Sequence, residues 1–366
     1  MLRVSSLTFL FLIVCLSGFP QSGRQKGYSE SVSRGERVDA PVSKIDPNSK
    51  SINSVGNSDS DIIRVETDLV TIPVRVTTKR GQPVPDIKQA EFRIFENGVE
   101  QEVAYFSTQD EPFTVALMLD MSYSSVFKLA EIQDAALAFV NQLRKDDKVM
   151  VVSFDEKVRV LCLPTDNRKA LRYAIEGAKI ASGTSLYAAF DKVLNENFRN
   201  VPGRKAIVIL TDGVDTTSVT KKAADVIRDI DELDTLIYPI QYDTFDDVRK
   251  SRRNDAQILY DDDDRPYVVE SPLVKGEKEG DYAEAREFLQ DLASHTGGRV
   301  QRVSSTTNLN SAFARIADEL RKTYSLGYYP SNEKTPGQKY SIRVRVYRPD
   351  LDIRARDNYS TARKRL

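Results

Sequence analysis

The stretch that decides the fold is Val115-Ala116-Leu117-Met118-Leu119-Asp120-Met121-Ser122-Tyr123-Ser124. Its first half is a continuous apolar run of strand length, which is typical of a parallel strand covered on both faces. The pattern recurs further along, in Ala206-Ile207-Val208-Ile209-Leu210, and there it is followed by Thr211-Asp212-Gly213. Two such strands, the first followed at once by Asp120 and the second by Thr211 and Asp212, predict a buried sheet with polar side chains at its carboxyl edge.

Helical and strand patterns alternate around these two runs. The expected strands span 113–119, 148–154, 206–210, 236–242 and 299–303, and the expected helices span 126–143, 168–178, 186–198, 221–233, 282–295 and 309–322. This alternation predicts an α/β fold over residues 113–322, with a doubly wound, mostly parallel, Rossmann-like open sheet and helices on both faces.

Strand patterns rich in β-branched residues lie before and after this region, over residues 62–110 and 323–360. We expect these two segments to form one antiparallel β domain that flanks the α/β domain, because chain ends of most domains lie close together. Residues 245–281 interrupt the α/β order with few apolar residues, and we expect a mobile surface insertion there. Within it, Asp261 to Asp264 is expected to be a solvated charge run, since consecutive aspartates cannot all converge on one calcium ion.

The N-terminus has the pattern of a secretory signal. Arg3 precedes an apolar run from Leu7 to Leu16, and small or turn-prone residues follow. We therefore expect a signal peptide over residues 1–20, export to the periplasm, the cell surface or the medium, and no stable membrane span. Cys15 leaves a lipoprotein signal open, although the bulky Val14 before it departs from the small residue of such signals. Residues 21–61 are polar and charged, which predicts a flexible linker.

The composition argues against several classes of function. Lys plus Arg (53) nearly cancels Asp plus Glu (54), so no global field attracts nucleic acid. His295 is the single histidine, which argues against a serine hydrolase and against a histidine-rich zinc site. We expect His295 at a helix end, interacting with the helix dipole. Once a signal is removed, Cys162 is the remaining cysteine, so no internal disulfide forms, which fits a bacterial envelope protein. We expect Cys162 to be a small buried hydrophobe.

Three polar segments carry the candidate chemistry: residues 120–124, residues 183–185 and residues 211–213. Alternate residues of an extended segment point the same way, so Asp120, Ser122 and Ser124 can converge on one point. Hard oxygen donors suit Mg²⁺, Mn²⁺ or Ca²⁺ rather than zinc or copper. Two carboxylates leave such a cation under-neutralised, and a carboxylate from outside is the natural further ligand. The structural alternative is that these segments only cap helices and form turns.

Together the three segments resemble the metal-ion-dependent adhesion site of von Willebrand factor type A domains. The resemblance covers residues 113–322 and implies a non-enzymatic adhesion or protein-binding module, with Mg²⁺ as the first choice of cation and an acidic residue of a protein partner as its ligand. The implied metal ligands are Asp120, Ser122, Ser124, Thr184 and Asp212. Thr296-Gly297-Gly298-Arg299, the strand-rich lead-in and the segment from Tyr324 to Pro330 are similar to exported A-domain proteins of acidobacteria.

Two other functions stay open. One is a scaffold in an envelope complex that acts by shape without a metal. The other is a hydrolase with Ser122 or Ser124 as nucleophile, which is disfavoured because the chain has no G-x-S-x-G elbow. The tyrosines at 324, 328 and 329 are expected to pack within strands rather than to form a carbohydrate-stacking platform.

Overall fold

The computed structural model describes residues 69–108, 111–122, 129–255, 257–260, 265–269 and 271–361. Four features expected from the sequence lie outside the described residues: the signal peptide with Cys15, the linker, Ser124 and the run from Asp261 to Asp264. In the part of the chain that is described, no helix is long and apolar enough to cross a membrane.

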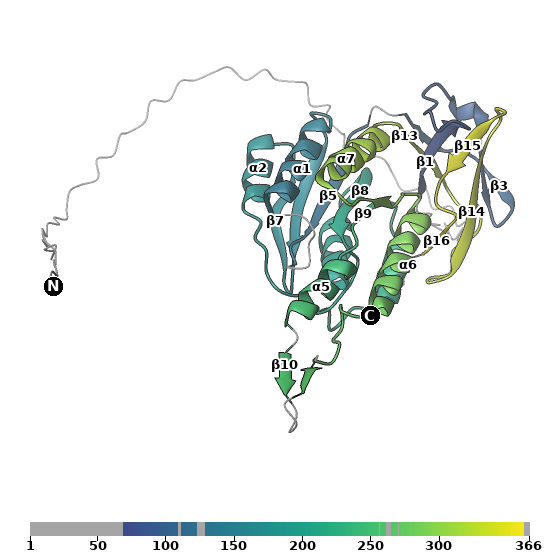
Figure 1. Cartoon of the computed structure of the whole chain (residues 1–366). Helices are drawn as coiled ribbons and strands as arrows, with labels where there is room; N and C mark the ends of the chain where they lie inside the picture. Colours follow the sequence, from purple (N-terminus) through teal and green to yellow (C-terminus); the bar gives the residue numbers. More distant parts are fainter. Residues whose placement is uncertain are drawn as a thin grey trace, which may run out of the picture. The chain divides into compact units, whose positions relative to one another are not determined.

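A six-stranded sheet lies at the centre of the α/β region, in the order β12-β9-β8-β5-β6-β7 (Figure 1). Every neighbouring pair is parallel except β6 and β7, which are antiparallel. β5 and β8 are buried along their whole length, as their apolar sequences predict. The bounds of the strands are β5 (Phe113–Asp120), β6 (Lys148–Phe154), β7 (Val158–Thr165), β8 (Arg204–Thr211), β9 (Thr235–Gln241) and β12 (Gln301–Arg302).

Helices cover both faces of this sheet, which confirms the predicted fold class. One face packs against α1 (Leu129–Gln142), α2 (Arg168–Glu176) and α7 (Thr306–Arg321), and the other against α3 (Leu186–Asp191), the π-helix η2 (Lys192–Phe198), α4 (Ala223–Asp231) and α6 (Glu279–Thr296). Successive side chains of β5 alternate between the two cores: Leu117 enters the first, and Met118 enters the second. Full burial of each such side chain contributes roughly 1.5–3 kcal/mol.

Two antiparallel sheets flank the α/β region, in the orders β15-β1-β13-β4 and β16-β14-β2-β3. β1 precedes the α/β region and β13 follows it, and they pair directly, with Val70 opposite Tyr328. The predicted antiparallel β flank is therefore confirmed, while the domain boundaries stay predictions. The bounds are β1 (Val70–Thr78), β2 (Phe92–Glu96), β3 (Val99–Gln101), β4 (Tyr105–Ser107), β13 (Thr323–Tyr328), β14 (Lys339–Val346), β15 (Leu351–Arg354) and β16 (Asn358–Ser360), and the 3-10 helix η1 (Gln89–Glu91) precedes β2.

The side chains of the two sheets share one core, which includes Ile72, Val74, Phe92, Tyr324 and Tyr328. Tyr324 and Tyr328 are fully buried, as strand packing predicts, whereas Tyr329 is 57% exposed. The Tyr328 hydroxyl donates to Glu96 Oε2 over 2.6 Å, so the buried carboxylate and the phenol satisfy each other.

The structure corrects two expectations. β7 was not predicted, and Cys162 within it is half-buried rather than buried, while its neighbour Leu163 is 64% exposed. The reason is that β7 is the antiparallel edge strand, so it lacks a neighbour on one side.

Residues 245–281 contain α5 (Phe245–Asp255) and the hairpin of β10 (Gln257–Tyr260) and β11 (Pro266–Val269), which extends beyond α5 in Figure 1. α5 carries ion pairs at i,i+3 spacing, a local stabilisation that needs few apolar residues.

Candidate metal site

Two aspartates meet at the carboxyl edge of the central sheet. Asp120 is the last residue of β5 and is fully buried, and Asp212 directly follows β8 and is 3% exposed. Leu119 of β5 lies beside Leu210 of β8 in the parallel register. The next residues along each strand therefore emerge at the same edge, as the sequence predicted.

Asp120 is held by hydrogen bonds from both sides. The Ser122 N–H donates to Asp120 Oδ1 over 3.1 Å, and the Thr211 hydroxyl donates to Oδ2 over 2.6 Å. Burial, followed by the nearby charge of Asp212, raises the pKa of Asp120 to about 7, although the hydrogen bonds of Thr211 and Ser122 act in the opposite direction. Without a cation, the ionised form of this carboxyl group is therefore disfavoured in the folded protein.

Asp212 is oriented by a second set of donors. The Val214 N–H donates to Asp212 Oδ1 over 2.9 Å, and the Thr244 hydroxyl donates to Oδ2 over 2.8 Å. Thr244 lies 3.0 Å from the hydroxyl of Tyr282, whose pKa burial raises to about 12. Neither Thr244 nor Tyr282 is predicted by the sequence pattern. Thr244 lies three residues after β9, so the end of a third parallel strand was the signal that could have identified it.

The loop that carries Thr184 is tied to both strand ends. Ala181 N–H donates to the Met121 carbonyl over 2.9 Å, and Ser122 and Ala181 form a parallel β-bridge. Thr184 N–H donates to Thr216 Oγ1 over 2.9 Å, and the Thr184 carbonyl accepts from the N–H of Thr216. These contacts use the backbone of Thr184 and not its hydroxyl.

The structure thus brings together the loops of four of the five predicted ligands, Asp120, Ser122, Thr184 and Asp212, each of them nearly or fully buried. Ser124 lies outside the described residues. Their donor set, two carboxylates and hydroxyls, fits a hard divalent cation. Whether these residues hold one stays a prediction.

Other carboxylates near the site are already engaged. Asp155 accepts from the Lys157 N–H over 2.8 Å and is bridged by Arg159. Asp215 accepts from the Tyr187 N–H over 3.2 Å and lies 3.5 Å from Lys275 Nζ. Accordingly, no group of three or more His, Cys, Asp or Glu side chains that could hold a metal occurs within the described ranges. A cation here would depend on hydroxyl ligands.

His295 lies at the other end of the sheet. It is in the last turn of α6, as predicted, and its Nδ1 is 2.8 Å from Asp231 Oδ1. The next residue, Thr296, accepts from the N–H of Ile237 near the start of β9. Ser122 follows the carboxyl end of β5, so the single imidazole of the chain is separated from it by the length of the strands.

Residues 115–214 match the model of the von Willebrand factor type A domain family. This segment contains all five predicted ligands, although Thr244, Tyr282 and the β flank lie outside it. A comparison with curated proteins finds no match.

Several solved structures are similar to the chain. An aerotolerance-related membrane protein from Bacteroides fragilis is 17% identical, with a TM-score of 0.39, covering 57% of this chain and 99% of the other. A von Willebrand factor type A protein from Catenulispora acidiphila is 10% identical, with a TM-score of 0.43, covering 81% and 74%. The vWF domain of the type V pili tip protein Mfa5 from Porphyromonas gingivalis is 14% identical, with a TM-score of 0.38, covering 57% and 94%. At these values the likenesses carry no information about a ligand or a partner of this chain.

Proposed function

We propose that this protein is a metal-dependent protein-binding or adhesion module of the cell envelope. It holds a divalent cation, with Mg²⁺ preferred to Mn²⁺ or Ca²⁺, through Asp120, Ser122, Ser124, Thr184 and Asp212, and the cation accepts a carboxylate from a protein partner. The observation that carries the proposal is the buried pair Asp120 and Asp212 at the ends of β5 and β8, where burial and mutual repulsion raise the pKa of Asp120.

The chemistry of the pair supports a cation. Two carboxylates near each other in a buried site repel, and a divalent ion between them removes that repulsion. Ser122 and Thr184 add neutral oxygen donors, so the bound ion would keep part of its charge. An acidic side chain of a partner would neutralise this charge and displace water from the ion.

Two further parts of the proposal depend on the sequence. Export rests on the apolar run from Leu7 to Leu16 and the small residues after it. A kinship with the exported acidobacterial A-domain proteins rests on the glycine-rich segment at 296–299 and the tyrosine-rich segment at 324–330. The metal-independent scaffold is the main alternative. A serine hydrolase is disfavoured, because His295 binds Asp231 at the far end of the sheet from Ser122.

Isothermal titration calorimetry of the chelator-treated protein with Mg²⁺, Mn²⁺ and Ca²⁺ tests the proposal. The wild type is expected to bind with a stoichiometry of about one, and Asp120→Ala to lose most of the affinity with the fold intact. Asp291→Ala is the matched control, because Asp291 is an exposed carboxylate of α6 and is not one of the candidate ligands. Equal heats of cation binding for the wild type and Asp120→Ala, or no heat for either, would favour the metal-independent scaffold.

A further inference from the structure

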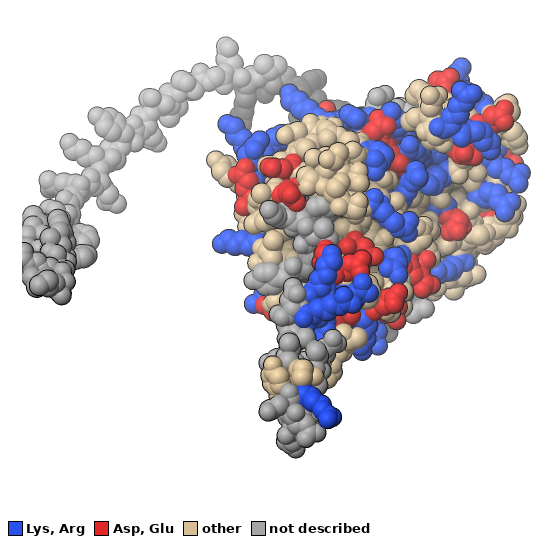
Figure 2. Space-filling model, in the orientation of Figure 1, with Lys and Arg blue, Asp and Glu red and all other residues tan. Residues whose placement is uncertain are grey.

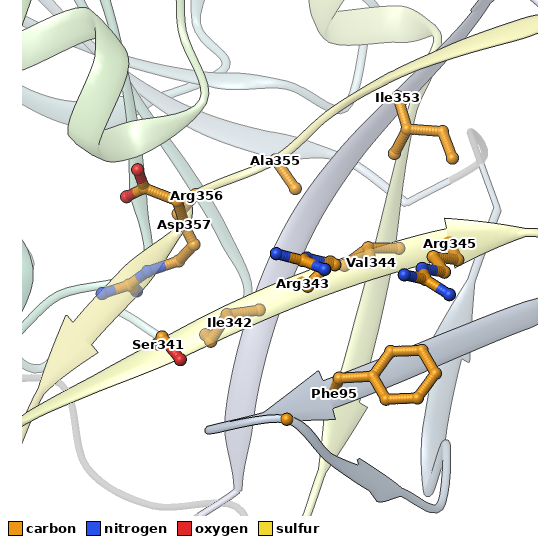
Figure 3. A pocket seen from close by; sticks show the side chains of 11 residues that line it. Phe95, Ser341, Ile342, Arg343, Val344, Arg345, Ile353, Ala355, Arg356 and Asp357 are labelled. Atoms are coloured by element: carbon orange, nitrogen blue, oxygen red, sulfur yellow. The ribbon is translucent and has the colours of Figure 1, made fainter.

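An open cavity of about 670 Å³ lies in the β flank, well apart from the candidate metal site. Its walls are β14 and the segment from β15 to β16, and its lining includes Arg343, Val344, Arg345, Ile353 and Ala355 (Figure 3). We call this cavity the β14–β15 slot.

The slot exists because two consecutive strands separate into different sheets. β14 pairs with β2 and β16, whereas β15 pairs with β1. The Ile342 N–H still donates to the Asp357 carbonyl over 2.7 Å. From that point to the turn at the far end of β14, over the described residues 343–354, the two strands form no ladder with each other. A gap therefore opens inside what would otherwise be an ordinary hairpin.

The register shows which backbone groups face this gap. The Ser341 carbonyl accepts from the Asn97 N–H, and the Tyr347 N–H donates to the Glu91 carbonyl, so the odd-numbered residues of β14 hydrogen-bond with β2 and its flanks. In an antiparallel pair the even-numbered residues then point their N–H and C=O groups the other way. Val344 therefore presents its backbone groups to the slot, and within the described residues they have no hydrogen-bond partner. An unpaired edge of this kind can accept an added strand.

The two faces of the slot differ in chemistry. On the outer face, Arg343 and Arg345 are exposed and form no ion pair among the described residues. The Arg345 guanidinium lies 5.3 Å from the centre of the Phe95 ring. On the inner face, Val344 and Ile353 pack against the core of the β flank. Figure 3 shows both arginines extending from β14, with Phe95 on the neighbouring β2.

Charge complementarity selects the occupant. On the face drawn in Figure 2, basic and acidic side chains are interspersed. The slot contains one exposed carboxylate, that of Asp357. The guanidinium of Arg356 is not available to a ligand, because it donates to the carbonyl oxygens of Asp231 and Leu233. The open guanidinium groups are those of Arg343 and Arg345, two residues apart on one strand. They match acidic side chains at alternate positions of an added strand, whose other side chains would meet the apolar inner face.

We propose that the β14–β15 slot binds an extended peptide segment of a partner protein in which acidic and apolar residues alternate. The peptide adds to the free edge of β14, and its acidic side chains pair with Arg343 and Arg345. This site is independent of the cation proposed above, so peptide binding persists in a chelator.

The test uses a blocked hexapeptide of alternating Glu and Val with the full-length protein, followed by fluorescence anisotropy and by amide NMR. The expected result is saturable binding that shifts the amide signals of Val344 and Ile353. Arg343→Ser combined with Arg345→Ser is expected to weaken binding about tenfold. Arg302→Ser is the matched control. Arg302 is an exposed arginine on β12 of the central six-stranded sheet, and it forms no ion pair in the described part of the chain.

Changes in the peptide keep the test independent of protein folding. Replacing each Glu by Gln should abolish the dependence on the two arginines, and N-methylation of alternate peptide bonds should abolish binding, because it removes the strand donors. The proposal is overturned if no binding occurs at about 1 mM, if the N-methylated peptide binds equally well, or if the double variant binds as the wild type does. Two further results would also overturn the proposal in favour of a simple anion site. Inorganic sulfate would compete with the peptide as well as the peptide itself does, and the peptide would bind without shifting the amide signals of Val344 and Ile353.

Discussion

Replacing Asp120 by asparagine tests the electrostatics of the candidate site in the absence of metal. The pKa of Asp120 is raised from 3.8 to about 7 in the folded protein, so the ionised group is less favourable in the folded than in the unfolded chain. Each pKa unit corresponds to about 1.4 kcal/mol, so a difference of about three pKa units lowers the free energy of unfolding by on the order of 4 kcal/mol above pH 7. Because the folded-state pKa is the higher one, this cost is absent below about pH 4, grows as the pH rises and levels off above about pH 7.

Asparagine removes the charge and keeps the shape. Its Oδ1 can still accept from the Ser122 N–H, and its amide can donate to the Thr211 hydroxyl once that hydroxyl rotates. In chelator at pH 8 we therefore expect Asp120→Asn to be more stable than the wild type by on the order of 2 kcal/mol, after about 1–2 kcal/mol is lost through the weaker hydrogen bonds. This corresponds to a rise in Tm of roughly 3 °C. At pH 4 the difference should vanish or change sign.

Urea unfolding of both proteins at a series of pH values in chelator measures this difference, with Asp291→Asn as a control that should show no pH-dependent gain. Addition of Mg²⁺ should then reverse the order, because the ion binds the folded wild type and stabilises it by mass action. A stability difference that is the same at pH 4 and pH 8, or a destabilised variant at pH 8 in chelator, would refute the reasoning.

Three other changes have defined outcomes. Thr184→Ala should lower Mg²⁺ affinity in calorimetry less than Asp120→Ala does, because water can replace a neutral hydroxyl, yet it should still impair binding of an acidic partner. Thr244→Val removes the hydroxyl that donates to Asp212, so it should cost about 1 kcal/mol of stability in urea unfolding and weaken Mg²⁺ binding about tenfold. Gly298→Ala would place a Cβ 1.8 Å from the Ile237 carbonyl oxygen, so it should lower the free energy of unfolding by more than about 3 kcal/mol or prevent soluble expression.

These changes have internal controls. Gly280→Ala has open space around the added Cβ, so it should leave stability almost unchanged. A Gly298→Ala protein as stable as Gly280→Ala would contradict the close approach to Ile237. Unchanged Mg²⁺ affinity in Thr244→Val would show that the orientation of Asp212 does not depend on this hydroxyl.

The fold was predictable where buried strands have continuous apolar sequences. β5 and β8 are continuous apolar runs because helices cover both of their faces, and the strand and helix order followed from them. β7 was not predictable in this way, because an edge strand with exposed residues such as Leu163 has no continuous buried pattern. α5 was missed because local ion pairs and not an apolar face support it.

For the candidate metal site, the sequence predicted which residues lie at the ends of the parallel strands. It did not predict which other side chains hydrogen-bond with them. The aspartates at 120 and 212 were predicted to meet because parallel strands share a carboxyl edge, and the structure places them there. Thr244 and Tyr282 were missed, since a single hydroxyl after a strand or on a helix carries no pattern of its own. The splitting of β14 and β15 into two sheets was equally invisible, because each strand alone has an ordinary alternating sequence.

Anomalous diffraction from crystals of the protein grown with Mn²⁺ would locate a cation at the candidate site directly. We expect one strong anomalous peak at the carboxyl edge of the central sheet, about 2 Å from the hydroxyl oxygens of Ser122 and Thr184 and beside Asp120 and Asp212. The same crystals of Asp120→Ala should lack the peak. A wild-type structure with ordered loops and no peak at this edge, or with the peak elsewhere, would show that these residues do not form the proposed metal site.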